Sequence, residues 1–188
     1  YGSEFEKIYT KYENEKTNLK KIKARTLMSK IIEAQIETGQ PYMLYKDAIN
    51  EKSNQKNIGV IKSSNLCAEI VEYSEKNETA VCNLASIGIP KFVNKDGSFD
   101  YKNLYETSKI AVRNLDNLID INYYPTKKTS KSNLLHRPIG LGIQGLADVF
   151  FKMNIPYDSS KARDVNKKIF ETIYFGALQE SLNLSKEK

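Results

Sequence analysis

The sequence has 188 residues, 40% of them hydrophobic, and a formal net charge of +6 from 29 basic and 23 acidic residues. No apolar run approaches the roughly eighteen residues that cross a bilayer, and the N-terminus lacks the pattern of a signal peptide. We therefore expect a soluble, cytoplasmic chain that does not bind membranes. Lys residues are scattered among Glu and Asn, which predicts a mildly basic surface rather than a stripe that binds nucleic acid. With only Cys67 and Cys82, a disulfide scaffold is excluded and a reducing compartment is favoured.

Helical spacing of apolar residues begins in FEKIYTKYE and returns between Lys23 and Thr38, where Gly39 should end the helix. PYMLY, at 41–45, is typical of an extended segment, and DAINEKSNQKN, which follows, of a polar turn of helix or a loop. A short strand is expected over Gly59–Lys62. Asn65–Tyr73 and Ala80–Ile89 are two further extended candidates, separated by the charged turn SEKNET. This pattern predicts a hairpin or two neighbouring strands.

The second half of the chain is predicted to be mostly helical. Asp100 is placed to cap a long amphipathic helix that ends near Asn122. The expected elements after it are a polar loop at 125–133, an extended segment at 138–142, a helix at about 144–153 and a last helix at 159–186. Internal repeats and a domain boundary are not visible. Short apolar strands between helices favour a helix-rich α/β fold that buries both faces of its sheet.

The run SSNLCAEIVEY places a thiol between an amide and a carboxylate. In an extended chain, side chains alternate, so Asn65, Cys67 and Glu69 would share one face, in a row of roughly 13 Å. A sugar or another small polar ligand could lie across such a row. The alternative is a partly buried strand in which Cys67 is a small hydrophobic residue and the other two face water. Spacing alone leaves both interpretations open.

The neighbours of Cys67 argue against a nucleophilic thiolate. Glu69 stands close by in sequence, and no Lys or Arg follows or precedes Cys67 within four residues. We therefore expect the thiol to stay protonated. A papain-like nucleophile would also need a positioned histidine, and His136 is the only histidine in the chain. A protonated thiol suits hydrogen-atom transfer, in which Glu69 could act as the base.

These residues carry a resemblance to a known family. SNLCAEIVEY, followed by VCNLASIGIPKFV, resembles the catalytic segment of the class I ribonucleotide reductase large subunit of the eukaryotic type. ETGQPYMLYKDAINEKSNQKN, RPIGLGIQGLADVF and IFETIYFGAL resemble further parts of that subunit, in the same order. The resemblance covers essentially residues 1–188. It implies that the chain is a fragment of the catalytic domain, part of a ten-stranded α/β barrel.

The resemblance also implies roles for four residues. Cys67 matches the cysteine whose thiyl radical abstracts the 3′ hydrogen of the ribose. Glu69 matches the carboxylate that takes the 3′-hydroxyl proton, and Asn65 the amide that binds the sugar hydroxyls. Cys82 matches one member of the redox-active pair that supplies electrons as the 2′-hydroxyl leaves as water. Its partner cysteine is expected in an N-terminal part that this chain lacks.

The implied parent enzyme has parts outside this chain. They include the N-terminal effector domain, which uses ATP and dNTP effectors, and the C-terminal part with the relay tyrosines and a cysteine tail. We expect a ribonucleoside diphosphate substrate, a large-subunit homodimer and thioredoxin or glutaredoxin as reductant. The radical is expected from a separate, metal-containing small subunit, and no cofactor is expected on the fragment itself.

Other motifs point to packing. GLGIQG imitates a phosphate-binding glycine pattern, but the acidic residue that a dinucleotide fold needs does not follow. His136 lacks metal-ligand partners in the sequence, so no metal site is predicted. Tyr123 and Tyr124 are interpreted as packing and loop residues. Two rival functions remain open, a two-cysteine thiol oxidoreductase with a Cys67–Cys82 disulfide and a basic, helical nucleic-acid-binding module.

Overall fold

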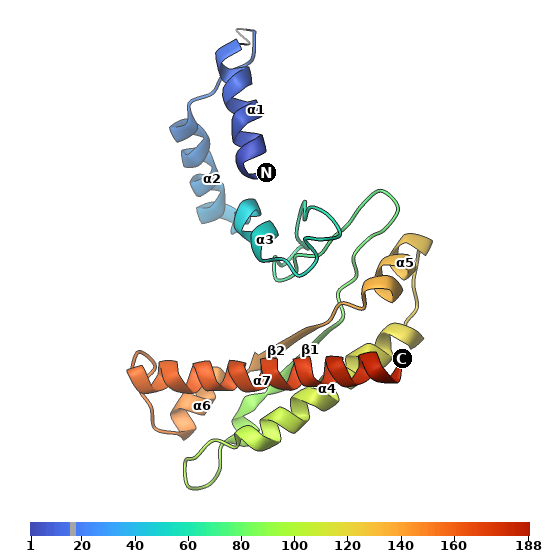
Figure 1. Cartoon of the computed structure of the whole chain (residues 1–188). Helices are drawn as coiled ribbons and strands as arrows, with labels where there is room; N and C mark the ends of the chain where they lie inside the picture. The colour runs from blue at the N-terminus through green and yellow to red at the C-terminus, as the bar shows by residue number, and fades with distance from the viewer. Residues whose placement is uncertain (16–17) are drawn as a thin grey trace. The chain divides into compact units, whose positions relative to one another are not determined.

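The structure is a computed structural model that describes residues 1–15 and 18–188. Its contacts divide into two compact units, Tyr1–Ser74 and Glu75–Lys188 (Figure 1). Among these described residues, no helix is both long enough and apolar enough to cross a bilayer.

The first unit contains helices α1 (Gly2–Glu15), α2 (Ala24–Thr38) and α3 (Lys46–Lys52), followed by an irregular segment. The predicted stop of α2 is confirmed. Gly39 adopts the left-handed conformation (φ 75°), and its N–H donates to the Gln35 carbonyl at 2.9 Å. The segment at 41–45, predicted to be extended, does not pair with another strand, and α3 begins directly after it.

The predicted strand over Gly59–Lys62 is wrong, because a side chain takes the place of a partner strand. Asn50 Oδ1 accepts from the Ile61 N–H at 2.7 Å, and Asn50 Nδ2 donates to the Ile61 carbonyl at 3.0 Å. Asn50 and Ile61 are the two buried residues among those described between Tyr1 and Ser74. Both backbone groups of Ile61 are therefore satisfied inside a loop.

The second unit is a helix-rich α/β arrangement, as predicted. Its elements are β1 (Leu84–Gly88), the 3₁₀ helix η1 (Ile89–Phe92), α4 (Tyr101–Ile121), α5 (Lys127–His136), β2 (Gly140–Gln144), α6 (Leu146–Lys152) and α7 (Ser160–Glu187). β1 and β2 pair in parallel, with Leu84 opposite Gly140 and Gly88 opposite Gln144. The prediction of a hairpin or two neighbouring strands in 65–73 and 80–89 is therefore wrong. The first segment forms no strand, and the strand in the second pairs with β2, to which it is joined by a long helical crossover.

Helices α4 and α7 lie side by side in the second unit (Figure 1). The Asp100 side chain caps α4 as predicted, accepting from the Asn103 N–H at 2.9 Å. A Cβ added at Gly176 of α7 would lie 3.0 Å from the Tyr105 carbonyl oxygen of α4, so glycine permits the close approach of the two helices. The core contains apolar residues from β1, η1, α4, α6 and α7 and from the loops before α4 and after α6. They are Ile87, Ile89, Phe99, Leu104, Val149, Phe150, Ile155, Ala162, Val165, Ile169 and Ile173.

The predicted polar loop at 125–133 is wrong, because most of it is helix α5. Thr126 and Thr129 form a reciprocal capping box at its start, in which Thr126 Oγ1 accepts from the Thr129 N–H at 3.2 Å. The last two helices begin within two residues of their predicted starts, at Leu146 and Ser160. Ser159 caps α7 by accepting from the Ala162 N–H at 3.1 Å.

Candidate active site

The segment 64–70, here called the Cys67 loop, is a turn and not the extended strand predicted. The Ala68 N–H donates to the Asn65 carbonyl at 3.2 Å, and Ala68 has a positive φ of 65°. A chain that turns back in this way does not alternate its side chains. The expectation that Asn65, Cys67 and Glu69 line one face of a strand is therefore corrected.

The turn nevertheless brings Asn65 and Glu69 together. Asn65 Nδ2 donates to Glu69 Oε1 at 2.7 Å, and Asn65 Oδ1 accepts from the Ile70 N–H at 3.1 Å. The single hydroxyl hydrogen of Ser64 is shared between the Ile70 carbonyl and Asn65 Oδ1, which lies 3.2 Å from Ser64 Oγ. One asparagine side chain thus closes the base of the Cys67 loop and orients the carboxylate of Glu69.

Cys67 lies at the turn between these two residues, and its thiol is exposed. An amide, a carboxylate and a thiol are therefore carried on one short turn. The amide can bind a hydroxyl, the carboxylate can accept its proton, and the thiol can exchange a hydrogen atom with a nearby carbon. Such a set suits chemistry on a sugar.

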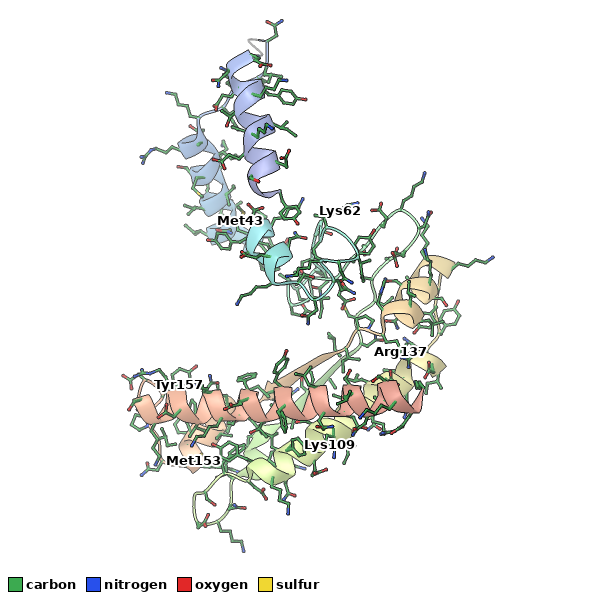
Figure 2. The ribbon with its side chains drawn as sticks, in the orientation of Figure 1. Met43, Lys62, Lys109, Arg137, Met153 and Tyr157 are labelled. Carbon is green, nitrogen blue, oxygen red and sulfur yellow. The ribbon has the colours of Figure 1, made fainter. Side chains whose placement is uncertain are left out.

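The chain on either side of the Cys67 loop is tied to the segment that follows α3. Gln55 Oε1 accepts from the Tyr73 N–H at 2.7 Å. A Cβ at Gly59 would lie 2.2 Å from the Tyr73 ring, so glycine is required where the ring packs on the backbone. Together with the Asn50–Ile61 pair, these contacts fix both ends of the irregular segment in which Lys62 lies (Figure 2).

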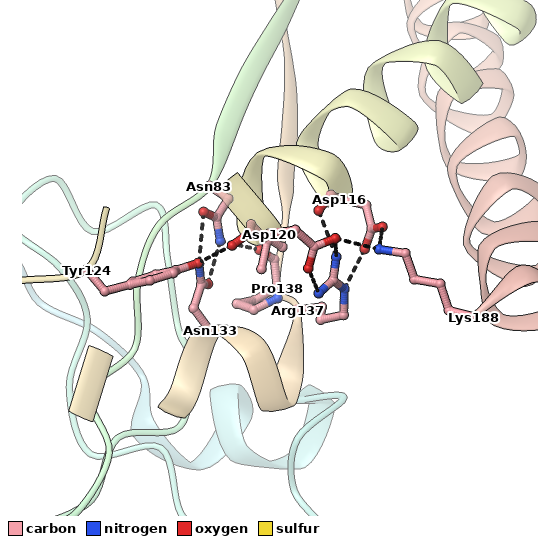
Figure 3. A network of polar contacts seen from close by, with 9 residues as sticks. Asn83, Asp116, Asp120, Tyr124, Asn133, Arg137, Pro138 and Lys188 are labelled. Carbon is pink, nitrogen blue, oxygen red and sulfur yellow. Dashed lines mark hydrogen bonds and ion pairs between the residues drawn. The ribbon is translucent and has the colours of Figure 1, made fainter. Parts of the chain in front are cut away.

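Cys82 belongs to the second unit, two residues before β1, and its side chain is exposed. The next residue, Asn83, is buried and enters a polar network with Asn133 and Tyr124 (Figure 3). Asn83 and Asn133 were not predicted as functional residues from the sequence. A polar residue inside the apolar run VCNLASIGI was the one signal available for Asn83.

A second polar cluster surrounds Arg137, which lies at the C-terminal end of α5 (Figures 2 and 3). Its guanidinium donates to Asp116 Oδ1 at 2.6 Å and to Asp120 Oδ1 at 2.7 Å, and Lys188 Nζ contacts the same two carboxylates. Hydrogen bonding from Arg137 lowers the pKa of Asp116 and of Asp120, although burial of Asp116 acts in the opposite direction. The cluster joins the ends of α4, α5 and α7.

His136 is paired with a carboxylate. Its Nε2 lies 2.9 Å from Glu78 Oε2, and both side chains are nearly buried. In the part of the chain that the structure describes, no group of three or more His, Cys, Asp or Glu side chains converges on a point where a metal could bind.

The glycine motif has the packing role expected of it. Gly145 has a φ of 83°, and an added Cβ would lie 2.5 Å from Pro90 Cγ. Only glycine therefore allows the chain to pass from β2 into α6 against Pro90.

Comparison with known proteins identifies the family of this chain. The family described as "Ribonucleotide reductase, barrel domain" matches residues 1–188. The chain belongs to this ribonucleotide reductase family. It is similar to proteins named ribonucleoside-diphosphate reductase large subunit from Variola virus (57% identical over 188 residues), Acanthamoeba polyphaga mimivirus (58% over 190) and Caenorhabditis elegans (55% over 185). These alignments cover 98% to 100% of the chain and 22% to 24% of each ribonucleotide reductase relative.

The ribonucleotide reductase family was therefore identified correctly from the sequence. The chain spans about a quarter of the length of the curated relatives it matches.

Proposed function

We propose that this chain is the central part of the catalytic subunit of a ribonucleoside-diphosphate reductase, within the ten-stranded α/β barrel. The parent enzyme converts ribonucleoside diphosphates to deoxyribonucleoside diphosphates for DNA synthesis. The observation that carries the proposal is the Asn65–Glu69 hydrogen bond of 2.7 Å, formed across a turn that exposes Cys67, in a chain that matches the family over its whole length.

In the proposed reaction, the Cys67 sulfur radical removes the 3′ hydrogen atom of the ribose. The C3′–H bond breaks, and an S–H bond forms. Glu69 takes the proton of the 3′-hydroxyl. One of two thiols, Cys82 and a second thiol outside this chain, gives a proton to the 2′-hydroxyl, which leaves as water. In all, the two thiols supply two electrons and two protons and become a disulfide; one proton leaves in the water and the other forms the new bond to hydrogen at C2′. Glu69 gives its proton back to the 3′ oxygen. Cys67 then returns the hydrogen atom to C3′ and is again a radical.

The contacts of Asn65 support this division of roles. Its Nδ2 donates to the Glu69 carboxylate, while its Oδ1 is held by the Ile70 N–H. A sugar hydroxyl that enters the loop can bind between the amide and the carboxylate and replace the contact that they make with each other. Glu69 is then already oriented toward the proton that it must take.

The partners follow from the proposed parent enzyme. The radical originates in a metal-containing small subunit, and thioredoxin or glutaredoxin reduces the disulfide formed at Cys82. ATP and deoxynucleotides regulate the activity from a separate effector domain, and two large subunits form a dimer. We place the enzyme in the cytoplasm, where exposed thiols such as those of Cys67 and Cys82 stay reduced.

The test uses the full-length subunit together with its small subunit. Replacement of Cys67 (Cys67→Ser) should abolish formation of deoxyribonucleotide, because a serine O–H bond is too strong to exchange hydrogen atoms with the sugar. Binding of the ribonucleoside diphosphate, measured by calorimetry, should be retained. Turnover by the Cys67→Ser enzyme would contradict the proposal. In the same assay, Cys82→Ser should stop multiple turnover with thioredoxin.

A further inference from the structure

The residue that follows Cys82 is one half of a buried amide pair. Asn83 Nδ2 donates to Asn133 Oδ1 at 2.6 Å, and Asn133 Nδ2 donates to Asn83 Oδ1 at 3.2 Å. The exposed fractions of the two residues are 2% and 0%. The pair therefore joins the chain before β1 to helix α5, without access to solvent.

The pair is anchored on two further sides (Figure 3). Asn133 Nδ2 also donates to Tyr124 Oη at 2.5 Å, and Tyr124 donates to the Ile119 carbonyl near the end of α4 at 2.7 Å. Asn83 Nδ2 also donates to the Pro138 carbonyl at 2.8 Å. Position 83 is thus fixed relative to α4, α5 and the chain that enters β2.

The backbone at Asn83 already follows the direction of the sheet. The Gly140 N–H donates to the Asn83 carbonyl at 2.9 Å, which continues the pairing of β1 with β2 by one residue. Exposure alternates along this stretch: Cys82 is exposed, Asn83 is buried and Leu84 is exposed. Because successive side chains of an extended chain point to opposite faces, a fixed inward direction for Asn83 fixes an outward direction for Cys82.

Apolar side chains could fill the same space, but they would not select one orientation. Hydrogen bonds are directional, and a fully satisfied buried network holds a single arrangement, since any shift leaves a polar atom without a partner. The amide pair therefore specifies the position of the chain at residue 83 more narrowly than packing alone.

We propose that the Asn83–Asn133 pair, anchored by Tyr124, is a positioning device that sets the direction of the Cys82 thiol. The inference rests on the proposed function, in which Cys82 must meet a second thiol to form a disulfide. Asn83 and Asn133 do not touch the substrate in this scheme. Their effect is on the geometry of disulfide formation, where a displacement of about 1 Å can lower a rate on the order of 100-fold.

The test is Asn133→Leu in the full-length subunit with its small subunit. This change removes both polar atoms of the Asn133 side chain, and with them its bonds to Asn83 and Tyr124, while keeping a similar volume. We expect kcat with thioredoxin to fall at least about tenfold, as misplacement of a reacting group predicts, with KM for the ribonucleoside diphosphate unchanged within about twofold. The alkylation rate of Cys82 by iodoacetamide should also change, and that of Cys67 in the same molecule should not.

Arg113→Gln is the matched control. Arg113 of α4 pairs with Glu180 and Glu187 of α7 at 2.6 Å and 2.7 Å, so its loss weakens the same unit without touching the amide pair. We expect kcat and Cys82 alkylation to stay unchanged in this variant. An equal fall of kcat in Arg113→Gln would show that Asn133→Leu acts through general stability, and would overturn the inference.

If Asn133→Leu does not fold, Tyr124→Phe tests the positioning role, because the Tyr124→Phe variant lacks one oxygen atom and keeps the amide pair in place. We expect the same changes at reduced size, about threefold in kcat, on the scale of the one hydrogen bond that Asn133 loses; the bond from the hydroxyl to the Ile119 carbonyl is lost as well. Unchanged kcat and unchanged Cys82 alkylation in the folded variant would refute the positioning role. Cys82→Ser, measured in parallel, separates the proposed function of Cys82 from the positioning role of the amide pair. If Cys82→Ser sustains multiple turnover, the proposed function of Cys82 is wrong. If Cys82→Ser is inactive and Asn133→Leu is fully active, only the positioning role is refuted.

Discussion

Replacement of Asn65 by alanine should loosen the Cys67 loop by an amount that the structure allows to be estimated. The change removes the neutral hydrogen bond from the Ile70 N–H (3.1 Å) and the bond to the charged Glu69 carboxylate (2.7 Å). The Ser64 hydroxyl, which also donates to Asn65 Oδ1, keeps its bond to the Ile70 carbonyl, so its contact is left out of the sum. A neutral bond contributes about 0.5–1.5 kcal/mol and one to a charged group about 1.5–3 kcal/mol. Glu69 is exposed, so the lower part of each range applies, and the sum is about 2 kcal/mol.

A loss of that size should raise the open fraction of the Cys67 loop about 30-fold, since each 1.4 kcal/mol corresponds to about a factor of ten. Amide hydrogen exchange in the full-length subunit, followed by mass spectrometry of a peptide spanning 64–73, measures this opening. The Ile70 amide should exchange faster by a comparable factor in Asn65→Ala. Asn57→Ala is the matched control, because Asn57 is an exposed asparagine of the same irregular segment. Equal exchange in wild type and Asn65→Ala, or an equal acceleration in Asn57→Ala, would refute the role given to Asn65.

Two further predictions concern the second unit. Gly145→Ala should destabilise the full-length subunit by about 2–4 kcal/mol, from the left-handed backbone and from a Cβ placed 2.5 Å from Pro90. Gly88→Ala, where an added Cβ meets nothing within 4 Å, should cost much less, and similar urea midpoints for the two variants would argue against the packing described. The lowered pKa of Asp116, caused first by hydrogen bonding from Arg137, contributes stability that is present above the ordinary carboxyl value of 3.8 and is lost as the pH falls below it. Wild type should therefore lose more free energy of unfolding than Asp116→Asn between pH 6 and pH 3 in urea titrations, and equal losses would count against this linkage.

The long helices were predictable because their signals are local. The side chain of Asp100 caps α4 and Gly39 ends α2, as predicted, and the last helix was expected to begin near Ser159, which caps α7. Helix α5 was missed because its residues are mostly Lys, Ser, Thr and Asn, which gives a weak apolar stripe. The Thr126–Thr129 capping box was the local signal for it.

The errors in the first unit have a different cause. Asn50 supplies the hydrogen bonds that a strand partner would have given to Ile61, and Asn65 does the same within the Cys67 loop for Ile70. Side chains of this kind compete with regular backbone pairing. An alternating pattern alone cannot show which of the two will form.

The pairing of strands and the buried polar pairs depend on residues far apart in sequence. β1 pairs with β2 across the whole of α4 and α5, and Asn83 meets Asn133. Neither residue of such a pair carries information about the other in a single sequence. The identities of Asn65, Cys67, Glu69 and Cys82 as candidates came from motifs, whereas the turn that joins Asn65 to Glu69 came from the structure.

The most direct test of the proposed chemistry is a competition between two forms of a ribonucleoside diphosphate, one with hydrogen and one with deuterium at C3′, in the full-length holoenzyme. If the sulfur of Cys67 removes that hydrogen atom, the hydrogen-bearing substrate reacts faster, and the substrate that remains becomes enriched in deuterium. Mass spectrometry of the remaining substrate gives the result. An isotope ratio that stays constant as the reaction proceeds would contradict hydrogen-atom abstraction at C3′.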